Sequence, residues 1–123
     1  MWLVKDGVIK EFTVIPDFVT LGYEIMAISC VNKKQVITEP TEKMMKWMKN
    51  YPNIVFVAKS EGMGKNGLMI SLHKNYTEYA KFVTENLQYW GDELEDYGSM
   101  LVSLKGLIVK PFSLAYLAEI VKP

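Results

Sequence analysis

Apolar residues follow two spacings along the chain, one typical of strands and the other of helices. Residues 21–32 (LGYEIMAISCVN) alternate as a strand does, and both of its sides are apolar. One side carries Ile25 and Ala27, and the other carries Met26, Ile28 and Cys30. This first predicted strand therefore needs an apolar cover on each face.

A helix and a hairpin are predicted next. Met44, Met45, Met48 and Tyr51 follow Pro40 at helical spacing, and Pro52 stops the run, which indicates a helix beginning near Pro40. Residues 53–60 (NIVFVAKS) predict a second strand. After a glycine-rich loop over residues 61–67, alternating residues up to position 73 predict a third strand, paired with the second as a hairpin.

The second half of the chain predicts one more helix and one more strand. Asn75 is a good N-cap, with Glu78 three positions later. The apolar stripe expected on this helix is Tyr76, Tyr79, Ala80, Val83, Leu87 and Trp90. Residues 94–104 predict a fourth strand. Residues 106–123 add a short apolar strand-like piece, a break at Pro111 and a last helix that Ser113 could cap.

The order βαββαβ predicts an α+β, ferredoxin-like fold: a four-stranded antiparallel sheet with two helices on one face. Two helices cover a sheet of this width only once, which leaves an open face of roughly 600 Å². That area approaches the share of one partner in a standard protein interface. We therefore expect a homodimer formed through the other face. The alternative is that the tail from Gly106 folds back over the sheet.

Composition limits the possible partners. A chain of 123 residues suits one domain, and its 14 basic residues balance its 14 acidic ones, so the net positive charge expected of a nucleic-acid-binding surface is missing. Cys30 is the only cysteine, so it cannot form an intramolecular disulfide, and a reducing cytoplasm fits. No apolar stretch approaches the roughly 20 residues of a membrane span. We expect a cytoplasmic protein with no membrane partner.

A family resemblance lies at the start of the chain. Gly7, Val8, Ile9 and Phe12, followed by the run Leu21, Gly22 and Tyr23, resemble a junction found in the leucine-responsive regulator/AsnC (feast/famine) family, in its archaeal-type members. In these transcription regulators the junction joins a winged helix-turn-helix to the effector-binding (RAM) domain.

The resemblance implies three segments. Residues 1–20 are the remnant of a wing or linker strand after a helix-turn-helix that this chain lacks. Residues 21–105 are the effector-binding and oligomerisation domain, and residues 106–123 are a C-terminal extension longer than in the typical member. DNA is then a partner only through the missing module, and no residue of this chain is expected to bind it.

In the resembling regulators, amino-acid effectors lie at the loop between the second and third strands, between dimers. The corresponding residues, our candidate ligand site, are Glu61, Gly62, Met63, Gly64, Lys65, Asn66 and Gly67. The aromatic residue and the aspartate of the usual family pattern are absent here. Glycines permit a positive φ and expose N–H groups, while Lys65 and Asn66 could hold a small carboxylate. Plain hairpin chemistry is the alternative.

The same glycines spell G-x-G-x-x-G, but this spacing indicates dinucleotide binding only when a helix follows, and here a strand follows. His73 stands alone, without a second metal ligand at a suitable spacing, so we expect it at the surface or a dimer interface. Asp92, Glu93, Glu95 and Asp96 predict a solvated acidic turn. Ser99 and Ser103 have no base partner along the sequence.

These patterns favour a regulator domain that is not an enzyme, with no catalytic residue, metal or cofactor. Its expected partners are further copies of itself, as a homodimer and then a higher homo-oligomer, and a small amino-acid-like effector. Two alternatives stay open. Dimeric ferredoxin-like barrels also include enzymes that act on small substrates, and a purely structural oligomerisation module would have the same fold.

Overall fold

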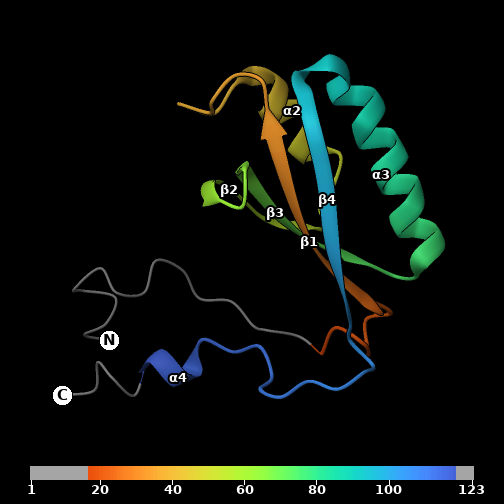
Figure 1. Ribbon diagram of the computed structural model, residues 1–123. Coiled ribbons are helices and arrows are strands. Elements are labelled where there is room, and N and C mark those ends of the chain that lie inside the picture. The colour runs from red at the N-terminus through yellow and green to blue at the C-terminus, as the bar shows by residue number, and fades with distance from the viewer. Residues whose placement is uncertain (1–16, 119–123) are drawn as a thin grey trace.

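The structure of the protein, a computed structural model, describes residues 17–118 (Figure 1). The strands are β1 (Ile25–Lys33), β2 (Ile54–Gly62), β3 (Lys65–His73) and β4 (Leu94–Ser103). The helices are α2 (Glu42–Lys49), α3 (Tyr76–Trp90) and the short α4 (Ala115–Ala118), and a 3-10 turn, η1 (Gly91–Glu93), follows α3. The expected βαββαβ order over residues 21–105 is confirmed. Residues 1–16 of the expected wing or linker remnant lie outside the described residues.

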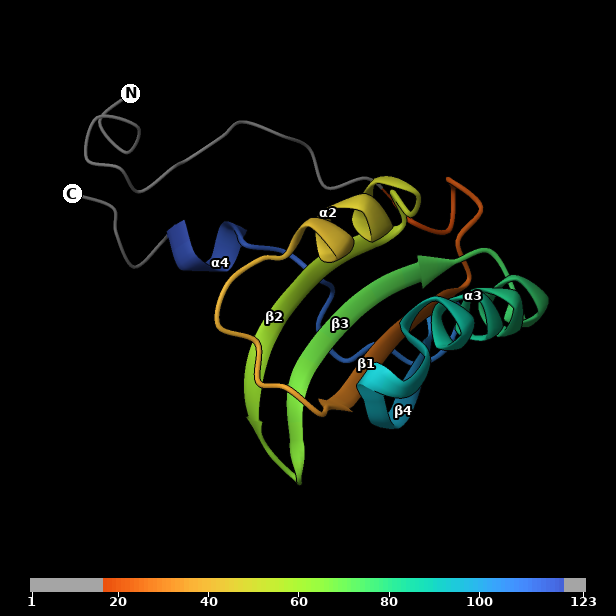
Figure 2. The same ribbon diagram turned by 90° about the horizontal axis from the view of Figure 1, so that it is seen from above.

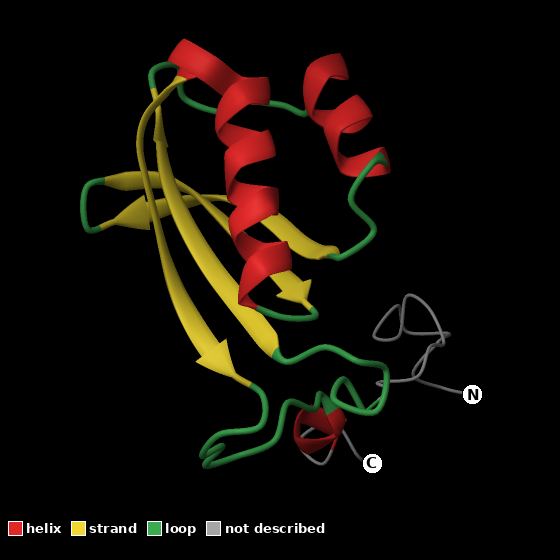
Figure 3. Ribbon diagram, turned by 90° about the vertical axis from the view of Figure 1, so that its right-hand side faces the viewer, coloured by secondary structure: helices red, strands yellow, loops and turns green. Residues whose placement is uncertain are grey.

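The four strands form one antiparallel sheet in the order β2-β3-β1-β4. Both long helices lie on the same face of this sheet (Figure 3). Seen from above, α2 lies over the β2 and β3 side, whereas α3 lies over the β1 and β4 side (Figure 2). The predicted ferredoxin-like α+β fold is therefore confirmed. As far as residue 118, the tail with α4 runs beyond one end of the sheet and does not cover its open face (Figure 1).

Local side-chain contacts set where the elements begin. Asn75 caps α3 as expected, its Oδ1 accepting from the Glu78 N–H at 2.9 Å. The N-cap of α2 is Thr41 instead of a residue at or before Pro40, and its Oγ1 accepts from the Met44 N–H at 3.2 Å. The first strand begins at Ile25, later than expected, because Asp17 and Gly22 hold the preceding residues in turns.

The core lies between the helices and the sheet. Its buried residues are Trp47, Met69, Phe82 and Trp90, and the rings of Trp47 and Trp90 meet edge to face with centroids 5.5 Å apart. The stripe predicted on the second helix is therefore wrong in part. Tyr76 and Leu87 are exposed, whereas Phe82 and Asn86 are buried.

Asn86 is a polar residue at the centre of this core, 1% exposed. Its amide nitrogen donates to the Phe82 carbonyl at 2.7 Å, and its Oδ1 accepts from the indole N–H of Trp47. The side chain thus joins α3 to α2 and satisfies the polar atom that a buried tryptophan carries.

Small polar residues let α3 approach the centre of the sheet. Ser29 and Ser71 are fully buried beside Ala27. The Ser29 and Ser99 hydroxyls are 2.8 Å apart, and the Tyr97 hydroxyl donates to Ser29 at 3.4 Å. Burial raises the pKa of Tyr97, so its hydroxyl stays protonated and available as a donor. The Ser99 hydroxyl is therefore paired with Ser29, a contact that holds the strands together and supplies no catalytic base.

The expectation that His73 lies at the surface or a dimer interface is wrong: it is 3% exposed within a single chain. Its Nε2 lies 2.8 Å from the Ser71 hydroxyl, and its ring packs against Phe82 with centroids 4.8 Å apart. The side chain projects from β3 toward α3, so the helix covers it. Burial lowers the pKa of His73, and the Glu78 carboxylate opposes this with a smaller effect.

Replacing Asn86 by Leu should reduce the free energy of unfolding by about 1–3 kcal/mol, because the Trp47 N–H and the Phe82 carbonyl lose a buried partner. Urea unfolding followed by tryptophan fluorescence would measure the change. Gln88→Leu, at an exposed position of the same helix, is the matched control and should change stability little. Equal losses in both variants would contradict this assignment.

The chain should lose stability as the pH falls from about 7.5 to about 5.5, because His73 binds a proton more readily when unfolded. Its pKa is lower in the folded chain. The stability is therefore complete above the unfolded pKa and decreases below it. His73 is the only histidine, so His73→Gln should flatten the profile in this range. Parallel profiles for the two chains, measured by urea unfolding, would refute the assignment.

Candidate functional site

The predicted glycine-rich loop is a tight hairpin. Only Met63 and Gly64 form the turn, both with positive φ, 52° and 71°. Two such residues give the twist that a two-residue hairpin needs. The other residues between 61 and 67 belong to the strands, and Gly62 pairs with Lys65. The extent of the predicted loop is therefore wrong, although its place between the second and third strands is right.

The seven candidate residues separate into a tip and a base. At the tip, Met63 is 90% exposed, and the backbone around Gly64 has open space. At the base, Gly67 is buried in β3, where an added Cβ would lie 2.9 Å from Cγ2 of Val31. Gly67 is thus a packing position of the sheet, whereas Glu61 and Gly62 lie with Met63 on the exposed side.

The two polar side chains proposed as ligand contacts already have partners. Asn66 pairs with the backbone of Lys33: its Oδ1 accepts from the Lys33 N–H at 2.9 Å, and its Nδ2 donates to the Lys33 carbonyl at 3.0 Å. These two hydrogen bonds resemble those between paired strands, and they prolong the β1–β3 pairing. Lys65 forms an ion pair with Asp96, with its side chain 20% exposed.

Asp96 was expected only as part of a solvated acidic turn. Asp92, Glu93, Glu95 and Asp96 are indeed exposed. Two of them also form ion pairs across the fold, Asp96 with Lys65 and Glu93 with Lys43. The sequence carried no signal for these pairs because the partners are distant along the chain.

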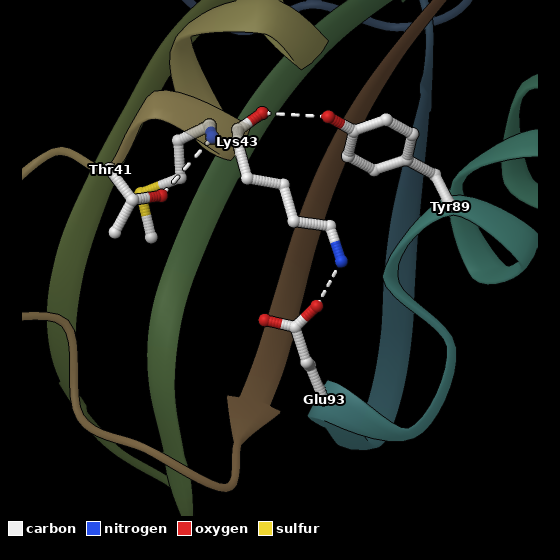
Figure 4. A network of polar contacts seen from close by, with 5 residues as sticks. Thr41, Lys43, Tyr89 and Glu93 are labelled. Atoms are coloured by element: carbon white, nitrogen blue, oxygen red, sulfur yellow. Dashed lines mark hydrogen bonds and ion pairs between the residues drawn. The ribbon is translucent and has the colours of Figure 1, made fainter.

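A small polar network fastens α2 to the end of α3 (Figure 4). The Tyr89 hydroxyl donates to the Lys43 carbonyl at 2.8 Å, and the Lys43 ammonium reaches Glu93. Thr41 caps α2 beside them. Both side chains of the ion pair are almost half exposed, so the pair adds little to the free energy of unfolding and mainly orients Lys43 and Glu93.

The helix-free face of the sheet carries an apolar row that crosses all four strands. The paired residues are Phe56, Ile70, Ile28 and Met100, in strand order. The two at the edges are the most exposed, Phe56 at 53% and Met100 at 70%. Met26 and Cys30 of β1 lie on the same face, as predicted, and Ile25 and Ala27 lie on the other.

Among the cavities of the described residues, two lie between the sheet and the helices. One, of about 400 Å³, has polar walls that include Tyr51, His73, Lys81 and Glu85, and the Tyr51 hydroxyl donates to Glu85 at 2.9 Å. Ser71 beside it is fully buried, so its hydroxyl has no access to a substrate. The second cavity, of about 340 Å³, lies beneath α2 and has mostly apolar walls.

Residues 17–118 contain no cluster of three or more histidine, cysteine or acidic side chains placed to hold a metal ion. Within the same residues, no helix is both long and apolar enough to cross a membrane.

Comparison with known proteins finds relatives in structure. No protein-family model matches the sequence, and no curated protein matches it significantly. The solved structure of PH0061 is 26% identical, with a TM-score of 0.65, over 92% of this chain and 71% of that one. AsnC of E. coli gives a TM-score of 0.67 at 14% identity, over 90% of this chain and 71% of its own.

A third neighbour is a transcriptional regulator of Neisseria meningitidis, solved as a complex with L-methionine. Its TM-score is 0.65 at 13% identity, covering 94% of this chain and 73% of the regulator. The neighbours with a stated role are transcription regulators and not enzymes. The resemblance read from the sequence is therefore confirmed, because this chain has the fold of the leucine-responsive regulator/AsnC regulators.

Proposed function

We propose that this chain is the effector-binding and oligomerisation domain of a transcription regulator that senses a small amino-acid-like ligand. The observation that carries the proposal is the apolar row on the open sheet face, in a fold whose structural neighbours are regulators. Two of those neighbours were solved with L-methionine. A regulator needs both a surface for assembly and a site whose occupancy alters that assembly.

The assembly surface is the row formed by Phe56, Ile70, Ile28 and Met100. In a single chain these side chains are exposed to water. In a two-fold symmetric dimer, the row of one copy packs against the same row of the other and removes both from water. The exposed edge residues would then contact a partner and lose water-accessible area. The proposed unit is a homodimer, from which a higher homo-oligomer forms.

The proposed ligand contacts are at the hairpin tip around Met63 and Gly64 and on the adjoining Lys65, which begins β3. Lys65 supplies the positive charge for a carboxylate, and N–H groups near Gly64 can approach it without an obstructing side chain. Asp96 competes with the ligand because it already neutralises the Lys65 ammonium. The proposed location is the cytoplasm, where the free thiol of Cys30 stays reduced.

The dimer can be tested by light scattering at micromolar concentration. We expect a mass at least twice the 14.1 kDa of one chain. Ile28→Lys places a charge in the centre of the row and should give monomers, since burying an unpaired ammonium is unfavourable. Met45→Lys, on an exposed position of α2, should keep the assembly intact. A parent chain that is monomeric would exclude this surface.

The hairpin site can be tested by calorimetric titration with the twenty common amino acids, starting with L-methionine. Lys65→Gln should weaken the binding of a ligand found in this way at least about tenfold, since a charge-assisted contact is lost. Asp96→Asn should leave binding equal or stronger because it frees the ammonium. Gly64 is a poorer choice for mutation, because its φ of 71° would strain any other residue.

Lys49→Gln, at an exposed position of α2 that lines none of the described cavities, is the control for loss of a lysine and should bind as the parent does. Unchanged affinity in Lys65→Gln would show that the ligand lies elsewhere. No binding of any amino acid would favour the structural-module alternative.

A further inference from the structure

We propose that the apolar cavity beneath α2 is a second binding site, which takes a small neutral aromatic molecule. It is separate from the hairpin tip and lies within one chain. The cavity is partly open, measures about 340 Å³, and has walls from every layer of the fold. α2 provides Met44, Trp47 and Met48, the sheet provides Val57 and Gly67, and the end of α3 provides Trp90.

The cavity exists because of two features of the sequence. Gly67 occupies a position of β3 that faces the helices, and because it has no side chain, Val31 and Ile37 pack over it and no larger side chain rises toward α2. Residues 34–40, which join β1 to α2, pass along the rim and add Ile37 to the wall without filling the space. The short α2, of eight residues, then covers only part of the floor.

The cavity is larger than a packing defect and is large enough for a small ligand. Engineered cavities of about 150 Å³ with apolar walls stay dry and bind benzene, and natural ligand sites begin at about 300 Å³. Water that enters an open space of this size meets apolar walls, and an apolar occupant that displaces this water gains hydrophobic burial.

The walls select a neutral and apolar occupant. The polar atoms at the inner end are already used, because Trp47 donates to Asn86 and Asn86 donates to Phe82. In the part of the chain that the structure describes, no buried side-chain nitrogen or oxygen lacks a partner. A ligand that places donors at this inner end would therefore leave them unsatisfied, whereas a donor at the open rim can stay with water. At the rim, the Lys33 ammonium lies over the Trp90 ring, 4.6 Å from its centroid.

An aromatic ring matches these walls better than an aliphatic chain. The thioethers of Met44, Met48 and Met69 are soft, adaptable groups that make favourable contacts with ring edges. The rings of Trp47 and Trp90 already meet edge to face, and the ring of a ligand can pack against them at a similar spacing. Indole is a suitable probe because it is flat, uncharged and mostly apolar, and its single N–H can point to water at the open rim.

The experiment is titration of the whole chain with indole, followed by calorimetry and by saturation-transfer NMR. Saturable binding is expected. Val57→Phe puts a ring into the cavity from β2 and should weaken indole binding at least about tenfold. Val55→Phe is the matched control: it lies two residues away on the same strand, is 55% exposed, and is not part of the cavity wall. It should bind indole as the parent does.

A second variant protects the test from a folding failure. Ile37→Trp fills the cavity from the rim and changes a connecting segment instead of a strand, and it should also abolish binding. Circular dichroism checks that each variant is folded. Lys65→Gln should bind indole normally, which separates this site from the proposed amino-acid site. Absence of binding to the parent, equal loss in Val55→Phe, or loss in Lys65→Gln would each overturn the proposal.

Discussion

The constraint on which the structure depends is that its central strand is apolar on both faces. β1 pairs with β3 on one side and with β4 on the other, so it lies in the middle of the sheet. Each of its two apolar faces therefore needs a cover. Ala27 and Ser29 on the helix side are small enough for α3 to pack closely. Ile28 on the other side has no helix above it. The chain therefore covers one face by itself, and the remaining apolar row is the physical reason for proposing a second copy.

Most of the fold could be predicted from spacing alone. Alternation found the strands, and Asn75 with its capping hydrogen bond fixed the start of α3. Part of the miss on the α3 stripe has a clear cause. An apolar pattern cannot include Asn86, yet this residue is buried because Trp47 supplies a donor that needs it. His73 was misplaced for the same reason, since Ser71 and Phe82 satisfy and cover it.

The candidate site was harder to predict, because its side chains are paired over long distances in sequence. Lys65 and Asn66 look free along the chain, but they meet Asp96 and Lys33 only after the sheet has formed. The turn was read as too long because glycines at 62, 64 and 67 look alike in sequence. In the fold, Gly64 provides a positive φ, and Gly67 provides a close approach to Val31.

The polar contacts around the hairpin gather at one end of the sheet. Lys33 ends β1, Asn66 lies near the start of β3, and Asp96 lies near the start of β4. The Lys65 ion pair therefore links the two strands that flank β1. A carboxylate that captures the Lys65 ammonium would compete with this link, and the edge strand β4 would lose a contact at that end. Met100, the most exposed member of the apolar row, lies on β4. An effector can shift an assembly only by binding its states with different affinity, and in the proposed regulator the Lys65–Asp96 ion pair is the contact that we expect to differ between them.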